Sequence, residues 1–349
     1  MWPDRRLIDL LGTEFPIVQA PMAGAMDQEL AIAAAKAGAL GSLPCAMLSA
    51  DKARDQVNIF RQQVSAPVSM NFFAHTPTAL DPAQEAAWRT RLAPYYKEQG
   101  LDPAMPLPSA ARAPFDAAMC EVVETLKPEI VSFHFGLPDD KLLARVKAAG
   151  CIVIASATIV KEAVWLEERG VDAIIAQGAE AGGHRSMFLT DDIATQPGTF
   201  ALVPQMVDAV RVPVIAAGGI ADGRGIAAAF ALGAAGVPGI AGQPDHSQES
   251  RAGSGRHDRH HQRDDGRAAR GIVNRAMREL GPVTADTPGF PHASAAFGPL
   301  KAAAEKTGSA DFTNLWAGQS VALTHEMPAT ELTQALAGAA LRRLSQMAG

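Results

Sequence analysis

The sequence predicts an α/β protein built as a parallel (β/α)8 TIM barrel, with an inserted lid segment and C-terminal helical additions. Short apolar runs rich in Val and Ile recur along the first 240 residues, and Ala-rich amphipathic segments separate them. This alternation is typical of repeated β-α units around a buried parallel sheet. With 349 residues, of which 48% are hydrophobic, the chain is long enough to bury one such barrel as a single domain.

The apolar runs number eight, which is the number that closes a barrel. The strands are expected at 15–22, 38–43, 67–73, 129–136, 151–157, 173–178, 212–218 and 234–240. The helices between them are expected at 28–37, 50–63, 115–126, 141–149, 160–169, 202–210 and 225–232. Asp139 and Thr158 stand where helix N-caps belong.

Two segments exceed the barrel repeat. Residues 74–114 contain many prolines and are too long for an ordinary βα connection, so they are expected to form a lid or excursion. After residue 270 the chain has a helical pattern, clearest at 274–280 and 331–347. We therefore divide the chain into a barrel, 1–270, and a helical extension packed on it, 271–349.

Charge and cysteine content limit the function classes. A net charge of −6 and an isoelectric point near 5.9 provide no basic field, so neither nucleic acid nor a membrane surface is an expected partner. The longest apolar-looking stretch, 212–242, is interrupted by charged residues and glycines and fails as a membrane span. The cysteines are few and lie far apart: Cys45, Cys120 and Cys151. Without a secretory signal, a cytoplasmic protein with a small-molecule partner is expected.

Polar residues mark the ends of two predicted strands, where a parallel barrel gathers its ligand-binding groups. Asn71 is an amide among apolar neighbours and needs a partner, from the protein or from a ligand. A histidine on a barrel strand is more often structural. His134, however, ends its strand, and an imidazole at the mouth suits proton transfer or contact with an anion, so we interpret it as functional.

Glycine-rich turns follow three strands. The first, 20–24 (APMAG), allows a flat ring to lie close to backbone amides, although a tight βα turn explains it equally well. The turns at 177–184 (QGAEAGGH) and 216–223 (AAGGIADG) allow positive φ and a close approach of N–H groups to phosphate oxygens. Two such turns on successive late strands match the phosphate site that barrels build there, which predicts a phosphate-bearing cofactor.

Other polar residues give weaker signals. His184 and Arg185 either contact phosphate or stabilise their own turn, and the sequence favours neither reading. Lys301, Trp316 and His325 form no constellation and are interpreted as ordinary residues of the C-terminal part.

Five motifs together give the sequence a specific resemblance over nearly its whole length. They are QAPMAG, FHFG with His134, QGAEAGGHR, AAGGIADGRG and ARGIVNRAMRE. In this combination the chain resembles the nitronate monooxygenases, formerly called 2-nitropropane dioxygenases, of the bacterial class I branch.

The resemblance implies a barrel that binds flavin mononucleotide (FMN) and oxidises alkyl nitronates, such as propionate 3-nitronate, with O2 to a carbonyl compound and nitrite, without reduced nicotinamide and without a metal. Met22 and Ala23 would lie against the isoalloxazine, and Asn71 and Gln177 would hydrogen-bond the flavin. Gly182 and Gly219 would offer backbone contacts, and His134 would face the substrate. The flavin would carry the electron transfer, and the protein would supply orientation and electrostatics. A homodimer is left open as the assembly.

The chain departs from the family after its eighth strand. Where the family has a phosphate-gripping turn similar to QIGTAF, this sequence reads PGIAG at 238–242 and then becomes rich in Ser, Arg and His. Reading the codons one base later permits TTVITNAMTG, which resembles the family segment, so we hypothesise that 238–267 is frame-shifted. As written, the stretch is polar and expected to be disordered, which would weaken binding of the flavin. Resequencing the gene tests this hypothesis.

Two alternatives remain at this stage. A flavin-dependent enoyl-acyl carrier protein reductase shares the barrel and a GGH turn but uses reduced nicotinamide, and the FHFG strand argues against it. A non-catalytic flavin- or phosphate-binding barrel is the other alternative, because the turn after the eighth strand is altered.

Overall fold

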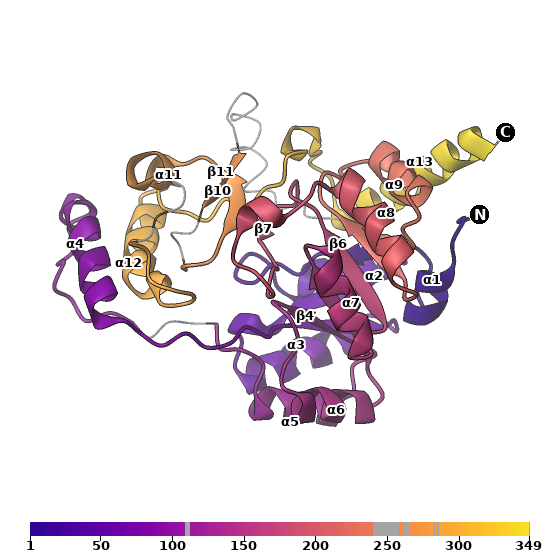
Figure 1. Cartoon of the computed structure of the whole chain (residues 1–349), viewed down its shortest axis with the longest axis horizontal. Coiled ribbons are helices and arrows are strands. Elements are labelled where there is room, and N and C mark those ends of the chain that lie inside the picture. The colour runs from indigo at the N-terminus through magenta and orange to yellow at the C-terminus, as the bar shows by residue number, and fades with distance from the viewer. Residues whose placement is uncertain (109–111, 240–257, 262–264, 282–283, 285, 349) are drawn as a thin grey trace.

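The structure is a computed structural model that describes residues 1–108, 112–239, 258–261, 265–281, 284 and 286–348 (Figure 1). Its centre is a curved sheet of six parallel strands, which follow one another in chain order. They are β2 (Gly41–Pro44), β3 (Val68–Phe73), β4 (Ile130–His134), β5 (Ile152–Ala157), β6 (Ala173–Gln177) and β8 (Val214–Ala217). All six residues of β3 are buried, as expected for a sheet covered on both faces.

Two further strands complete the barrel. β1 (Ile17–Gln19) pairs in parallel with β9 (Val237–Gly239). On one side Leu40 N donates to Ile17 O at 2.9 Å, and on the other Ala216 N donates to Gly236 O at 2.9 Å. Eight parallel strands therefore surround the core, and the predicted TIM barrel is confirmed.

Helices cover the outside of the barrel in the predicted order. They are α2 (Gln28–Lys36), α3 (Ala50–Gln63), α5 (Ala117–Leu126), α6 (Asp140–Ala148), α7 (Val160–Glu168), α8 (Thr199–Ala209) and α9 (Gly223–Ala231). Asp139 caps α6, as predicted, by accepting from Lys141 N and Leu142 N, both at 3.0 Å. The prediction for Thr158 is wrong: Ile159 is the N-cap of α7, and Thr158 instead donates its amide and hydroxyl to the Glu162 carboxylate.

A short helix closes the N-terminal end of the barrel. α1 (Arg6–Leu11) buries Leu7 and Leu11 in one apolar cluster with inward residues of several strands, including Ile130 and Ile215. Because this end is filled by apolar side chains, the opposite end, where the strands finish, is left to carry a polar site.

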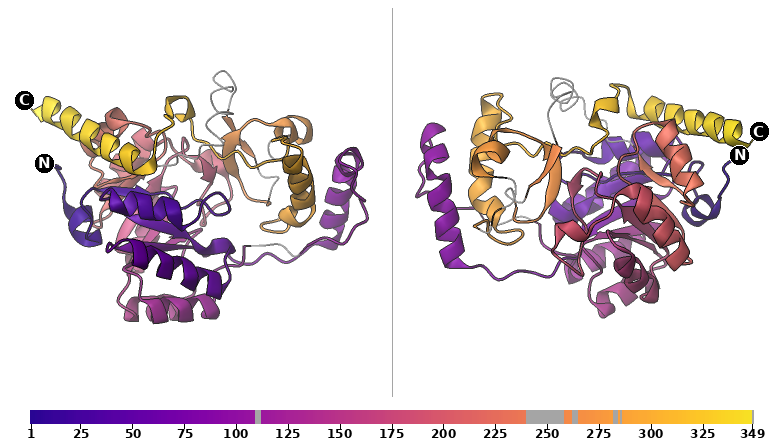
Figure 2. Two further views of the ribbon diagram at one scale, coloured as in Figure 1. Left: turned by 180° about the vertical axis from the view of Figure 1, so that it is seen from behind. Right: turned by 45° about the horizontal axis from the view of Figure 1, so that its top comes forward.

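Three helices form a group beside the barrel (Figure 2). α4 (Pro82–Glu98) packs against α11 (Arg275–Leu280) and α12 (Ala293–Lys306) around a separate apolar cluster that includes Trp88 and Phe297. The proline-rich segment 74–114 thus contains a helix of 17 residues, which begins at the Asp81 cap with Pro82 in its first turn.

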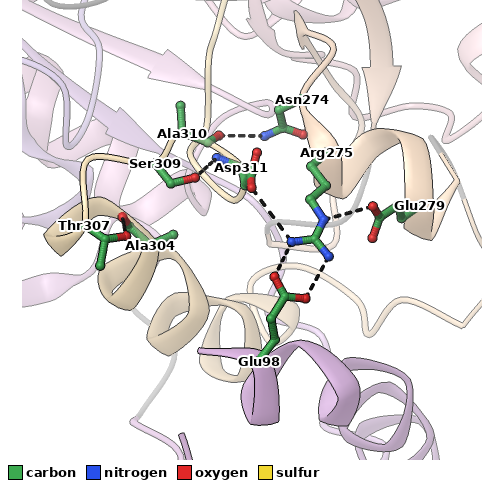
Figure 3. A network of polar contacts seen from close by, with 9 residues as sticks. All are labelled: Glu98, Asn274, Arg275, Glu279, Ala304, Thr307, Ser309, Ala310 and Asp311. Atoms are coloured by element: carbon green, nitrogen blue, oxygen red, sulfur yellow. Dashed lines mark hydrogen bonds and ion pairs between the residues drawn. The ribbon is translucent and has the colours of Figure 1, made fainter. Parts of the chain in front are cut away.

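A polar network also joins α4 to the C-terminal part of the chain (Figure 3). The Arg275 guanidinium contacts both carboxylate oxygens of Glu98, at 2.5 and 2.8 Å, and one oxygen of Glu279 at 2.9 Å. Asp311 Oδ2 lies 3.8 Å from the same guanidinium. These contacts show that the 74–114 segment packs on the start of the C-terminal extension. The division of the chain at residue 270 stays a prediction.

The remaining elements connect this group to the barrel. β7 (Gly183–His184), β11 (Ala269–Ile272) and β10 (Asp258–His261) form an antiparallel sheet, and α13 (Ala329–Ala348) packs on α9 and α2. The 3-10 helices of the described chain are η1 (Cys45–Met47), η2 (Ile193–Thr195) and η3 (Val321–Leu323).

Of the stretch 238–267, the structure describes residues 238–239, 258–261 and 265–267, and the rest lies outside the described residues. No helix of the described chain is long and apolar enough to cross a bilayer.

Candidate active site

The predicted polar residues lie at the C-terminal ends of neighbouring strands. In the register of β3 and β4, Asn71 is opposite Ser132 and Phe73 is opposite His134. Asn71 Nδ2 donates to Ser132 Oγ at 2.9 Å and contacts its carbonyl oxygen at 3.4 Å. The buried amide thus has the partner that its position demands, and its Oδ1 remains as an acceptor.

His134 is a neutral imidazole at the mouth of the barrel. Its Nδ1 lies 2.9 Å from the hydroxyl oxygen of Ser156 at the end of β5. Burial, together with the charges of His184, Arg267 and Arg185, lowers the pKa of His134 to about 3. The hydroxyl can donate to Nδ1 or accept from it, so Nε2 can serve either as a hydrogen-bond donor or as a base.

Aromatic side chains surround this imidazole. The ring centroid of Phe135 lies 5.3 Å from that of His134, and Phe73 lies 6.4 Å away with a stacked orientation. Phe290 and a further histidine, His75, complete the wall with their ring centroids 4.6 Å apart. His75 is 4% exposed, and among the described residues its Nδ1 has no hydrogen-bond partner.

His184 lies in the same wall and is paired with a buried carboxylate. Its Nε2 is 2.6 Å from Asp265 Oδ2, and Arg112 lies 3.1 Å from the same oxygen. Burial alone would raise the pKa of Asp265, but the charges of His184 and Arg112 hold it well below its usual range. Asp265 is therefore ionised and holds both side chains at this edge of the mouth.

Gln177 is engaged with the turn that follows it. Its Nε2 donates to His184 O at 2.9 Å, while its Oε1 accepts from both the amide and the hydroxyl of Ser186, at 2.8 and 3.1 Å. One N–H of the side-chain amide remains for a ligand, because a carboxamide nitrogen carries two donors.

The two glycine turns meet beneath a segment near the C-terminus. A Cβ built on Gly182 would lie 2.7 Å from the backbone of Ala317 and Gly318, so only glycine fits there. Gly219 has φ +70°, and its carbonyl accepts from Ser320 Oγ at 2.8 Å. The segment 315–320 therefore lies across both turns, and we call it the strap.

The strap corrects one interpretation of the sequence. Trp316, which was expected to be an ordinary residue of the C-terminal part, has its ring 5.2 Å from the ring of His184 and a backbone bridge to Gly271. His325 is exposed, and Lys301 lies 3.8 Å from Glu305. Trp316 and His75 were missed because only the fold brings them to the mouth. The signal available in the sequence was the position of His75 two residues beyond the third strand.

Met22 and Ala23 lie in a separate turn. Ala25 N donates to Met22 O at 3.1 Å, and both predicted residues are half-buried. Gly24 faces the thioether of Met47 on η1, which is 3.5 Å from a Cβ built on this glycine. β1 runs parallel to the strands that carry Asn71, His134 and Gln177, so the turn with Met22 and Ala23 follows it at the same end of the barrel.

A cavity of about 360 Å³ lies between η1 and the start of α5. It is lined by residues such as Met47, Phe115 and Met119 and includes neither His134 nor the glycine turns. In the described part of the chain, no group of three His, Cys, Asp or Glu residues is arranged to hold a metal ion.

The fold defines the chain as a (β/α)8-barrel protein with polar side chains at the C-terminal ends of its strands, and comparison with known proteins gives its family. The nitronate monooxygenase family model matches residues 4–242 and 258–338. The chain is 42% identical to a nitronate monooxygenase of Paraburkholderia phytofirmans and 36% identical to one of Pseudomonas aeruginosa. These alignments cover 95% of this chain and 94% and 97% of the relatives. The chain belongs to the nitronate monooxygenase family.

Solved structures agree with this assignment. A nitroalkane oxidase from Streptomyces ansochromogenes superposes with a TM-score of 0.89 at 32% identity, covering 98% of this chain and 99% of that one. FabK from Thermotoga maritima superposes with a TM-score of 0.72 at 25% identity, covering 99% and 98%. The family match omits 243–257, which lies inside the stretch that we hypothesise to be frame-shifted.

Proposed function

We propose that the protein is an FMN-dependent enzyme that oxidises alkyl nitronates with O2 to a carbonyl compound and nitrite, without reduced nicotinamide. The observation that carries the proposal is His134, a neutral imidazole at the end of β4. Its strand pairs with β3, which carries Asn71, and it lies at the same end of the barrel as the two glycine turns. A nitronate is an anion, and an Nε2–H donor at this position suits its oxygen.

The residues of the mouth fit FMN. Asn71 Oδ1 and the second N–H of Gln177 are available to the polar edge of a flat ring. The turns at 178–183 and 218–219 include glycines with positive φ, Gly183 at +75° and Gly219 at +70°, so their amides can approach phosphate oxygens without interference from side chains. Met22 and Ala23 would border the ring from their own turn. When bound, FMN would supply the electron acceptor for the nitronate and the donor for O2.

The protein's own part is to bind and orient the substrate. His134 would hold one nitronate oxygen through Nε2–H, while Ser156 fixes the ring through Nδ1. With a neutral nitroalkane, the other tautomer would place the lone pair on Nε2, which can then accept the α-proton. The aromatic wall of Phe73, Phe135 and Phe290 excludes water from the reacting atoms.

The test is spectroscopic and kinetic. The purified protein, with FMN added if it is isolated without it, is expected to have flavin absorption bands and to take up O2 on addition of propionate 3-nitronate without NADH. His134→Asn is expected to retain the flavin bands and to lose at least about tenfold in kcat/KM with a nitronate, the low end for a lost hydrogen bond to a charged group. With a neutral nitroalkane the expected loss is at least about 100-fold, the low end for a lost general base. Full turnover by this variant would remove His134 from the proposed role.

The second candidate function is reduction of an enoyl thioester, which the likeness to FabK favours. Oxidation of NADH with a crotonyl thioester, without O2 uptake from nitronates, would support it instead. A protein that binds no flavin under these conditions would support the non-catalytic alternative.

A further inference from the structure

The turn at 178–183 is folded around one buried side chain, Arg185. Its Nη1 donates to the carbonyls of Gly178 and Ala179, both at 3.3 Å. Its Nη2 donates to the carbonyl of Gly183 at 3.0 Å and to that of Ala181. The residue is 0% exposed. One guanidinium therefore draws four carbonyl groups of a single turn toward the interior of the protein.

This arrangement fixes where the amides of the turn point. In a planar trans peptide, a carbonyl and the N–H of the next residue point in opposite directions. Because the carbonyls of Ala179 and Ala181 point at Arg185, the amides of Glu180 and Gly182 point away from it. In the described chain neither amide donates a hydrogen bond. The amide between them, Ala181 N, donates to Gly178 O at 3.1 Å, and the two outward amides on either side of it form an anion-binding concavity.

The interior behind the turn is positively charged. Arg270, which is 8% exposed, donates its Nε to Ala179 O at 2.8 Å and so brings a second guanidinium to the same peptide group. Burial and the charge of Arg270 lower the pKa of Arg185 to about 9, which leaves it protonated at neutral pH. The carboxylate of the turn, Glu180, is bound to the amide and hydroxyl of Thr199, at 2.7 and 2.8 Å.

Glycines keep side chains away from the Gly182 amide at two positions, one in the turn and one in the strap that packs against it. A Cβ built on Gly183 would meet nothing within 4 Å, and one built on Gly318 of the strap would lie 3.1 Å from the amide nitrogen of Gly182. Glycine at these two positions leaves the amide of Gly182 uncovered by a side chain.

We propose that Arg185 is a positioning residue of the phosphate site: it holds the turn so that the Glu180 and Gly182 amides face the FMN phosphate, and it adds positive potential from behind without touching the ligand. The inference rests on the proposed function, because it assumes that FMN binds at this mouth. It goes beyond that function by assigning the charge of the phosphate site to a side chain with no exposed surface.

The experiment compares two ligands that differ only in the phosphate. Dissociation constants of FMN and riboflavin are measured by quenching of flavin fluorescence for the wild-type protein, Arg185→Met and Arg185→Lys. The control is Arg145→Met, which removes the same charge from a surface pair with Glu124. Thermal unfolding of each variant verifies that it is folded.

Arg185→Met is expected to raise the dissociation constant of FMN by about 10- to 100-fold, the range for losing a hydrogen-bonded charge, and to change that of riboflavin by less than about twofold. Arg185→Lys is expected to fall in between, because one ammonium cannot reach four carbonyls, and it replaces the Met variant if that variant does not fold. Arg145→Met should leave both constants unchanged.

Equal weakening of FMN and riboflavin would mean that Arg185 only maintains the fold, and unchanged FMN binding would mean that the turn does not depend on it. Either result overturns the inference. A wild-type protein that binds neither ligand would instead refute the proposed function.

Discussion

Two histidines at the mouth, His75 and His134, make the stability of the protein sensitive to mild acid. His75 is 4% exposed, and burial, with the charge of Arg267, lowers its pKa to about 4 from 6.5, although Asp265 opposes the shift. The unfolded chain therefore binds a proton below pH 6.5 that the folded chain does not bind until about pH 4. The stabilisation that the folded state gains from neutral His75 is fully present above pH 6.5, and it is lost as the pH falls from 6.5 toward 4.

The size of the effect follows from proton linkage. Between pH 7 and pH 5, a histidine whose pKa falls from 6.5 to about 4 destabilises the folded state by about 2 kcal/mol. His134, with its pKa lowered to about 3, adds up to a similar amount, less a discount because it is partly exposed. The total expected loss is about 2 to 4 kcal/mol. Asp265 does not contribute here, because an unfolded aspartate titrates only near pH 3.9.

The assay is urea unfolding without added ligand at pH 7 and pH 5. His75→Leu removes the titrating group and a buried nitrogen that has no partner in the described structure, so at pH 7 its stability should stay within about 1 kcal/mol of wild type. Its loss between pH 7 and pH 5 should be smaller than that of wild type by about 2 kcal/mol. The control is His325→Asn at an exposed position, which should keep the wild-type pH dependence. An unchanged pH dependence in His75→Leu would refute the reasoning.

Three further predictions concern the supports of the site. Glu162→Gln should lower the free energy of unfolding by about 2 to 4 kcal/mol in urea titrations, because the buried carboxylate accepts from Thr158 and from the amides of Phe188 and Leu189; a loss below about 1 kcal/mol would contradict this. Gly182→Ala should weaken FMN binding by about tenfold or more, because its Cβ would lie 2.7 Å from the strap backbone. Gly183→Ala, where φ is +75° and the space is open, should lose only about 1 kcal/mol of stability. Equal effects of the two substitutions on FMN binding would be inconsistent with the packing. Arg275→Met should accelerate amide hydrogen exchange in Pro82–Glu98 by about fivefold, as expected for the loss of about 1 kcal/mol of partly exposed ion pairing. Exchange in the barrel strands should stay unchanged. Equal acceleration in α4 and in the barrel strands would show that α4 does not open separately.

The strands and the strand-end residues could be predicted because both depend on local pattern. Short apolar runs separated by Ala-rich amphipathic segments marked all eight strands, and the position of a residue at the end of a run was enough to place Asn71 and His134 at the mouth. The strand limits differed by a few residues: the first expected strand, 15–22, is only three residues long as β1.

The parts that could not be predicted depend on contacts between distant segments. α4 was not recognised because prolines surround its apolar residues Trp88, Leu92 and Tyr96, whose spacing of four gains meaning only when α12 covers them. Trp316 lies more than 130 residues after His184, and β11 must pair with β7 before the two rings can meet. Thr158 was misplaced because its amide and hydroxyl both donate to Glu162, four residues later, and Ile159 takes the cap position instead.

The positive charges of the mouth also connect binding of the FMN phosphate with the basicity of His134. The charge of Arg185, which we infer to act on the phosphate, is one of those that lower the pKa of His134. Arg267, whose guanidinium lies 4.0 Å from the ring centroid of Phe135, acts on His134 in the same direction. A phosphate dianion bound at the turn would offset part of this positive potential and raise the pKa of His134 toward its ordinary value. Cofactor binding and the basicity of the imidazole would then be coupled through space, so the basic strength of Nε2 would be set only once the cofactor is in place.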